Sequence, residues 1–150
     1  MKVRLGDVLV RMGVLSESER EEVLAAQRSS GRPFGVLAEE LFGVSPRDVE
    51  RAWAAQYAEL SGRVDLGRQA TDPDVLSLVE RRQAYQFQVL PLRFEGRELV
   101  VATSESALPR AMRFAGWALG EACSFVVASD GELMDHLSRA YPARGGRVSA

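Results

Sequence analysis

The sequence predicts an α+β fold, in which an N-terminal helical unit of two helix-turn-helix repeats precedes a small α/β unit with an antiparallel hairpin. Two observations lead to this class. The first is an internal repeat of 29 residues within residues 4–56, and the second is a change of hydrophobic period near residue 89. The predicted boundaries are a helical repeat unit over 1–61, a small α+β unit over 62–141 and a flexible tail over 142–150.

The internal repeat aligns residues 4–27 with residues 33–56 without a gap. The alignment pairs Gly6 with Gly35, and both copies end on Ala-Ala-Gln, so that Gln27 pairs with Gln56. Apolar positions match as well, which indicates that the two copies bury equivalent faces. Two copies are too few for a solenoid. We therefore expect them to pack on each other and to form a pseudo-symmetric cleft.

Each copy is predicted to be a short helix, a turn and a longer helix. In copy one, Ser16 and Glu19 form the S-x-x-E capping box that begins a helix, and Gly31 lies where that helix should end. In copy two, Ser45 is the predicted cap and Pro46 the first helical residue, where a missing N–H costs nothing.

In the second half, apolar residues alternate on both sides of Glu95-Gly96, which predicts a β-hairpin with these two residues as its turn. Pro91 is then expected at a sheet edge, where no ladder donor is needed. The other expected elements are a short strand over 64–66, a helix from Asp72-Pro73 through about Arg82, a helix over 107–119, a strand over 123–128 and a helix over 131–141.

Composition excludes several classes of function. The net charge of −2, with both signs interspersed, indicates no general attraction to DNA, RNA or membranes. Cys123 and His136 are single, which excludes a disulfide scaffold and a two-histidine zinc site. Lys2 is the only lysine, so the chain has no GxxxxGK[ST] phosphate loop. We expect no catalytic residues, no metal site and no cofactor.

The sequence also predicts where the domain acts. No apolar run reaches the roughly 18 residues of a membrane span, and the N-terminus lacks the apolar core of a signal peptide. We therefore expect a cytoplasmic protein with no direct membrane insertion.

Residues 4–27 closely match the motif RLGxxLxxxGxxxxxxLxxxLxxQ, with Arg20 at the first of its two later leucines. The matching residues are Arg4, Leu5, Gly6, Leu9, Gly13, Leu24 and Gln27. Over about residues 4–141 the chain resembles the N-terminal domain of type II secretion and type IV pilus assembly ATPases. The version of that domain that binds cyclic di-GMP is known as the MshEN domain.

The resemblance implies a non-catalytic, cyclic di-GMP-binding regulatory domain of bacterial signalling. Arginine is suited to this ligand because it pairs with phosphate and donates to guanine O6 and N7. Glycine lets the backbone approach closely. Carried over residue by residue, the motifs imply ligand contacts from Arg4, Leu5, Gly6, Leu9, Gly13, Leu15 and Gln27 in copy one, and from Arg32, Phe34, Gly35, Val44 and Gln56 in copy two.

The second copy departs from the motif at several positions. Pro33 replaces the arginine, although Arg32 is adjacent, and Phe34 and Ala38 replace leucines. Phe42 stands at the glycine position, with Gly43 one place later. Phe42 either narrows the second half of the cleft or belongs to the core, and the sequence leaves both readings open.

Two classes of function therefore remain. One is a sensor that binds cyclic di-GMP in preference to ATP. The other is a protein–protein interaction domain that docks on a membrane-anchored secretion or pilus component without binding nucleotide, because the same family supplies that role. The first motif, with one departure at Arg20, favours the sensor, and the more altered second motif favours the interaction domain.

Overall fold

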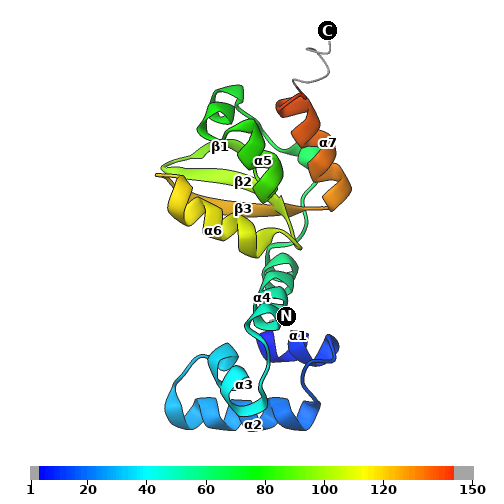
Figure 1. Cartoon of the computed structure of the whole chain (residues 1–150), viewed down its shortest axis with the longest axis vertical. Helices are drawn as coiled ribbons and strands as arrows, with labels where there is room; N and C mark the ends of the chain where they lie inside the picture. Colours follow the sequence, from blue (N-terminus) through cyan, green and yellow to red (C-terminus); the bar gives the residue numbers. More distant parts are fainter. Residues whose placement is uncertain (1–3, 144–150) are drawn as a thin grey trace. The chain divides into compact units, whose positions relative to one another are not determined.

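The computed structural model describes residues 4–143. The chain divides into two compact units, at residues 1–60 and 61–150 (Figure 1). The first unit is helical, and the second holds a three-stranded sheet with helices, so the predicted α+β class is confirmed. The tail predicted over 142–150 lies outside the described residues from 144 onward.

The first unit contains the two predicted repeats of a short and a long helix. Local signals in the sequence set several of the helix ends, because Ser16 and Glu19 form the complete capping box and Gly31 ends the helix at a φ of 72°. The Asp48 N–H donates to Ser45 Oγ at 3.1 Å. The helices are α1 (Leu5–Arg11), α2 (Glu17–Ser30), α3 (Phe34–Phe42) and α4 (Pro46–Ser61).

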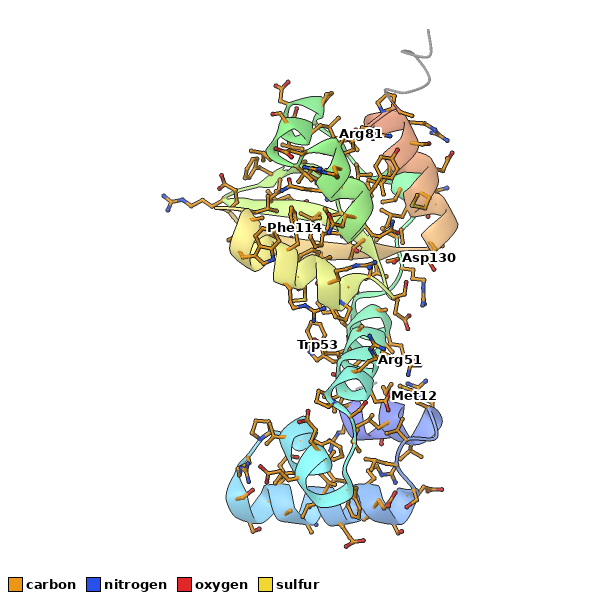
Figure 2. All side chains as sticks on the ribbon, in the orientation of Figure 1. Met12, Arg51, Trp53, Arg81, Phe114 and Asp130 are labelled. Carbon is orange, nitrogen blue, oxygen red and sulfur yellow. The ribbon has the colours of Figure 1, made fainter. Side chains whose placement is uncertain are left out.

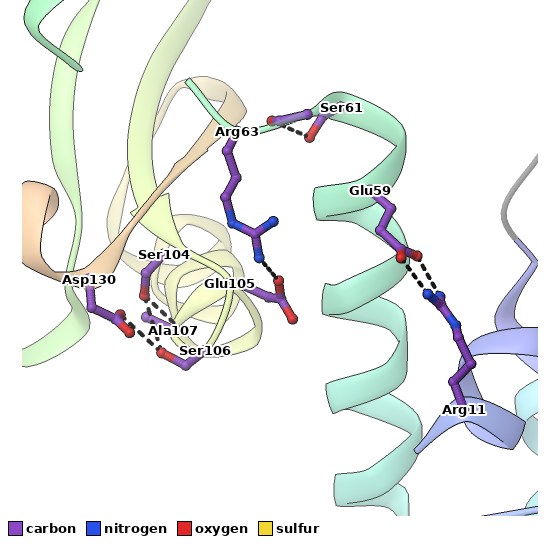
Figure 3. A network of polar contacts seen from close by, with 10 residues as sticks. Arg11, Glu59, Ser61, Arg63, Ser104, Glu105, Ser106, Ala107 and Asp130 are labelled. Atoms are coloured by element: carbon purple, nitrogen blue, oxygen red, sulfur yellow. Dashed lines mark hydrogen bonds and ion pairs between the residues drawn. The ribbon is translucent and has the colours of Figure 1, made fainter. Parts of the chain in front are cut away.

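Apolar residues from both copies form one core in this unit. Phe42 packs on the core as a partly buried side chain, which favours the second of the two readings left open by the sequence. An ion pair from Arg11 to Glu59, with both contacts at 2.7 Å, joins α1 to α4 at the surface (Figure 3). The buried core residues are Val8, Leu9, Leu15, Val23, Phe34, Leu37, Ala38, Val44 and Ala52.

The second unit is built on a sheet with the strand order β1-β2-β3. Strands β1 (Leu90–Glu95) and β2 (Glu98–Ser104) form the predicted antiparallel hairpin, and β3 (Ala122–Ala128) lies parallel to β2. Pro91 lies on the edge strand β1, as predicted, next to an irregularity in the register. Helix α6 (Leu108–Ala118) connects β2 to β3, and α7 (Asp130–Ala140) packs against β1 and β2.

The hairpin turn lies one residue later than predicted. Glu95 pairs with Glu98, so the loop consists of Gly96 and Arg97. Gly96 has a φ of 61° and takes the first loop position, where the turns of two-residue hairpins require a positive φ. The glycine therefore fixes the turn, and Glu95 remains in the strand.

Two elements predicted at the start of the second unit, over residues 64–82, are wrong. Residues 64–66 form no strand, because the chain makes only an isolated bridge from Arg63 to Val127 and then turns into the 3-10 helix η1 (Leu66–Arg68). The helix predicted from Asp72 to about Arg82 is two elements, η2 (Pro73–Leu78) and α5 (Arg81–Phe87). Val79, whose side chain is buried, separates them in an extended conformation.

Aromatic and polar contacts complete the second unit. Phe114 on α6 stacks on Phe87 of α5 with ring centroids 4.6 Å apart (Figure 2). Arg63 and Glu105 form an ion pair, and Ser104 accepts a hydrogen bond from the Ala107 N–H at 3.3 Å (Figure 3). Among the helices of residues 4–143, none has both the length and the apolarity that a bilayer span requires.

Candidate ligand-binding cleft

The first unit contains a cleft of about 430 Å³, a size within the range of small-molecule sites. All four helices of the unit contribute to it. Helices α1 and α3 begin at the cleft, α2 lines it from its first turn to near its end, and α4 lines it with residues of its later turns. The lining residues are Arg4, Leu5, Gly6, Asp7, Arg20, Leu24, Gln27, Phe34, Gln56 and Leu60.

Gly6 allows close packing at one wall of the cleft. A Cβ atom at this position would lie 2.8 Å from Cζ of Phe34 and 3.1 Å from Cγ of Arg20. Both distances are shorter than ordinary carbon–carbon contacts. The absence of a side chain at Gly6 thus makes the room that the ring of Phe34 and the stem of Arg20 occupy.

Gly35 has the equivalent neighbours in the other copy. A Cβ atom there would lie 2.8 Å from Cγ1 of Val49 and 3.7 Å from Cδ2 of Leu5. Val49 is the repeat partner of Arg20, and Leu5 is the repeat partner of Phe34. Each glycine therefore meets the residue that precedes the other glycine, which is the contact pattern of a pseudo-two-fold pair.

The two glutamines of the repeat both line this cleft. Gln27 lies near the end of α2 and Gln56 lies at the equivalent position of α4, and both side chains are half-buried. A carboxamide donates and accepts hydrogen bonds at once. The cleft thus offers equivalent polar groups on its two sides.

Charge is distributed unequally between the two copies. Within residues 4–143, the cations of the cleft are Arg4 and Arg20, both from copy one. Arg4 is exposed at the N-cap of α1. Arg20 is 23% exposed and donates from Nη1 to Asp7 Oδ1 at 3.1 Å, so its head is held at the wall.

Comparison with known proteins agrees with this architecture. A family model described as the MshEN domain matches residues 57–147, which is more than half of the chain. The chain belongs to the MshEN domain family. The matched range covers the end of α4 and the second unit, whereas most residues of the cleft precede it.

A curated relative of this MshEN domain is a longer protein. The chain is 23% identical over 145 residues to the type IV pilus assembly ATPase PilB of Myxococcus xanthus. That match spans 97% of this chain and 25% of PilB, so the MshEN domain corresponds to about a quarter of the relative's length.

Two solved structures share the fold of the domain. A structure of MshE with cyclic di-GMP is 29% identical and superposes with a TM-score of 0.53, covering 93% of this chain and 100% of that one. The N-terminal domain of XpsE is 21% identical with a TM-score of 0.51, covering 94% and 99%. The likeness to XpsE shows the fold alone.

The structure of the MshEN domain brings half of the residues named by the motifs to the cleft. These are Arg4, Leu5, Gly6, Gln27, Phe34 and Gln56. Leu9, Leu15 and Val44 lie in the core of the first unit instead, and Leu9 is fully buried. Their placement indicates that they pack beneath the residues that line the cleft.

The other three motif residues also lie away from the lining. Gly13 follows α1 at a φ of 78°, and Gly35 packs between helices. Arg32 is exposed and donates to both carboxylate oxygens of Glu40, at 2.8 and 2.5 Å. These hydrogen bonds hold the pKa of Glu40 below its usual value.

Sequence reasoning missed Asp7, Arg20, Leu24 and Leu60 as cleft residues, although Leu24 matches a leucine of the motif. Arg20 carried a signal, because it is a charged residue where the motif has leucine. Asp7 and Leu60 carried none, since neither position is part of the motif. Within residues 4–143, no three His, Cys, Asp or Glu side chains are grouped to hold a metal ion.

Proposed function

We propose that this MshEN domain is a non-catalytic regulatory domain that binds cyclic di-GMP in the cleft of its first unit. The observation that carries the proposal is the pseudo-two-fold cleft, in which the repeat-related glutamines Gln27 and Gln56 face the same space. Cyclic di-GMP is itself two-fold symmetric, so a cleft with two equivalent halves suits it. The related MshE, which was solved with cyclic di-GMP, supports the choice of ligand.

The chemistry of the lining suits the parts of this ligand. Cyclic di-GMP has two phosphates and two flat guanines. Leu5, Leu24 and Phe34 offer apolar surface for the bases. Arg4 supplies a positive charge that forms no ion pair with another group of residues 4–143, and it is free to meet a phosphate.

The relatives support the proposed regulatory role. PilB is a pilus assembly ATPase, and the MshEN domain corresponds to about a quarter of it. We infer that binding of cyclic di-GMP to this domain controls a secretion or pilus assembly protein. The proposal places the domain in the cytoplasm, where nucleotides are available.

Isothermal titration with cyclic di-GMP and with ATP tests the proposal. We expect binding of cyclic di-GMP with clear preference over ATP, because the chain lacks a lysine-bearing phosphate loop. If the protein binds neither nucleotide at high micromolar concentration, the domain is a protein-docking module instead. ATP hydrolysis or equal affinity for both nucleotides would also contradict the proposal.

The substitution Arg4→Ala gives the proposal a residue-level test. Loss of a hydrogen bond to a charged group should weaken cyclic di-GMP binding by about 1.5–3 kcal/mol. Arg28→Ala is the matched control, because Arg28 is an exposed arginine of α2 outside the cleft. Thermal melts of both variants should match the parent, and equal affinities of the two variants would count against Arg4 as a contact.

A further inference from the structure

We propose that Arg20 is the second phosphate-binding cation of the cleft and replaces the arginine that the second repeat lacks. The inference rests on the proposed function, since the ligand is the same. It assigns a ligand contact to a position where the family motif has leucine.

The second repeat brings no cation to the cleft from the expected place. Pro33 is the repeat partner of Arg4 and carries no charge. The neighbouring Arg32 donates to Glu40 from both Nη1 and Nη2, and it is not among the residues that line the cleft. If only the first positions of the two motifs supplied cations, a ligand with two phosphates would therefore meet a single arginine, Arg4.

Arg20 combines two roles in one side chain. Its stem passes over Gly6, where the Cγ atom lies 3.1 Å from the position of a Cβ. Val49 packs over Gly35 in the same way in the other copy. The stem of Arg20 thus packs as an apolar residue would, and its charged guanidinium lies beyond the stem. Arg20 therefore adds a positive charge to the cleft lining.

The guanidinium of Arg20 keeps donors for a ligand. Nη1 donates to Asp7 at 3.1 Å and Nε donates to Glu21 at 3.3 Å. Within residues 4–143, the one contact of Nη2 is a distant ion pair with Glu17, at 4.0 Å. Arginine has five N–H groups, so the contacts to Asp7 and Glu21 orient the fork and leave the Nη2 hydrogens for a phosphate oxygen.

The nearby carboxylates weaken this charge little. The Glu17 and Glu21 side chains are 82% and 61% exposed, so water and salt screen them. Asp7 also lines the cleft and is 49% exposed. With Arg4 and Arg20 against Asp7, the lining keeps a net positive charge, as an anionic ligand requires.

Titration of three variants with cyclic di-GMP tests the inference. Arg20→Leu installs the residue of the motif and keeps an apolar stem over Gly6. We expect it to lose at least about tenfold in affinity, the scale of one charge-assisted hydrogen bond. Arg20→Lys should lose less, because a phosphate is met by charge and does not require the fork. Arg28→Leu, which removes an exposed charge from the same helix, should bind like the parent.

The salt dependence separates a phosphate contact from a structural role. Between low and moderate salt, the parent should lose more affinity than Arg20→Leu, because the variant has one ionic contact fewer. Thermal melts at each salt concentration show whether the variants stay folded. The inference is overturned if Arg20→Leu loses less than tenfold in affinity for cyclic di-GMP, or loses no more affinity than Arg20→Lys. It is also overturned if the affinity of Arg20→Leu depends on salt as strongly as that of the parent. If the parent itself fails to bind, the proposed function fails and not the assignment of Arg20 alone.

Discussion

Gly6 and Gly35 occupy equivalent positions of the repeat but face different kinds of neighbour. An added methyl group at Gly6 would meet the end of the Phe34 ring and the stem of Arg20, and both side chains line the cleft. The same group at Gly35 would meet Cγ1 of Val49, a β-branched side chain with little rotamer freedom. The same substitution should therefore have two different effects.

We predict that Gly6→Ala weakens cyclic di-GMP binding, because Phe34 and Arg20 must shift in the cleft. Gly35→Ala should destabilise the first unit by about 1–3 kcal/mol, the usual cost of overpacking. Chemical unfolding and titration of the two variants measure both effects. A Gly35→Ala protein as stable as the parent, or a Gly6→Ala protein with unchanged affinity, would contradict this account of the glycines.

Tyr141 provides a prediction about pH. Burial raises the pKa of its phenol to about 12, and its O–H donates to the Leu76 carbonyl at 2.7 Å. The unfolded value is about 10, so the folded state favours the neutral phenol. Its contribution to stability is complete below about pH 10 and is lost as the pH rises from about 10 to about 12.

Tyr141→Phe should remove this alkaline loss. The free energy of unfolding of the variant should be lower than that of the parent near neutral pH and should fall less steeply above about pH 10. Urea unfolding at a series of pH values provides the measurement. Parallel declines in the two proteins would show that Tyr141 does not titrate in this way.

Single residues were predictable where the signal is local. Ser16 and Gly31 are recognised from their immediate neighbours, and both act as predicted. Arg32 was named as a ligand contact, but its pairing with Glu40 depends on how α3 is placed after the turn. Arg20 showed only a departure from the motif, since its approach to Asp7 is set by the packing of α1 on α2.

At the scale of elements, α3 runs to Phe42, whereas the repeat of α1 would end two residues earlier. Gly43 then takes the left-handed conformation at a φ of 66°, as Gly13 does in copy one. The displaced glycine lets Phe42 remain helical and pack on the core. The departure from the motif at this position is therefore a longer helix.

We predict that Phe42→Ala destabilises the first unit by about 2–3 kcal/mol, less than a fully buried phenylalanine would cost. Leu41→Ala is the matched control, because Leu41 is adjacent on α3 and is 51% exposed. Its effect should be below about 1 kcal/mol. Thermal and urea unfolding compare the two, and a Phe42→Ala variant with parent stability and tighter binding would place Phe42 at the cleft instead.

Helices were predictable from sequence where periodicity and caps agree, as in α2 and α4. Periodicity alone predicted α6 and β3. The segment between η1 and α5 failed for a physical reason. Val79 is buried in an extended conformation between two helical segments, and the bridge from Arg63 to Val127 links residues far apart in the chain. Neither feature leaves a local periodic signal.

For the molecule as a whole, the repeat alone predicted a cleft between two equivalent copies. The structure has that cleft, and the exchanged glycine contacts show how the copies pair. The unequal charge of its two sides was beyond the motif comparison, because it depends on where Arg20 and Arg32 point. The proposed sensor thus combines a nearly two-fold shape with cations from one copy.

The most direct test of this account is a titration of the isotope-labelled protein with cyclic di-GMP, followed by NMR. We expect saturable shifts of the Gly6 backbone amide and of the side-chain amides of Gln27 and Gln56, because all three line the cleft. Shifts of both glutamines together would place the ligand between the two copies of the repeat. An absence of shifts, or shifts confined to residues 61–143, would contradict the proposed binding site.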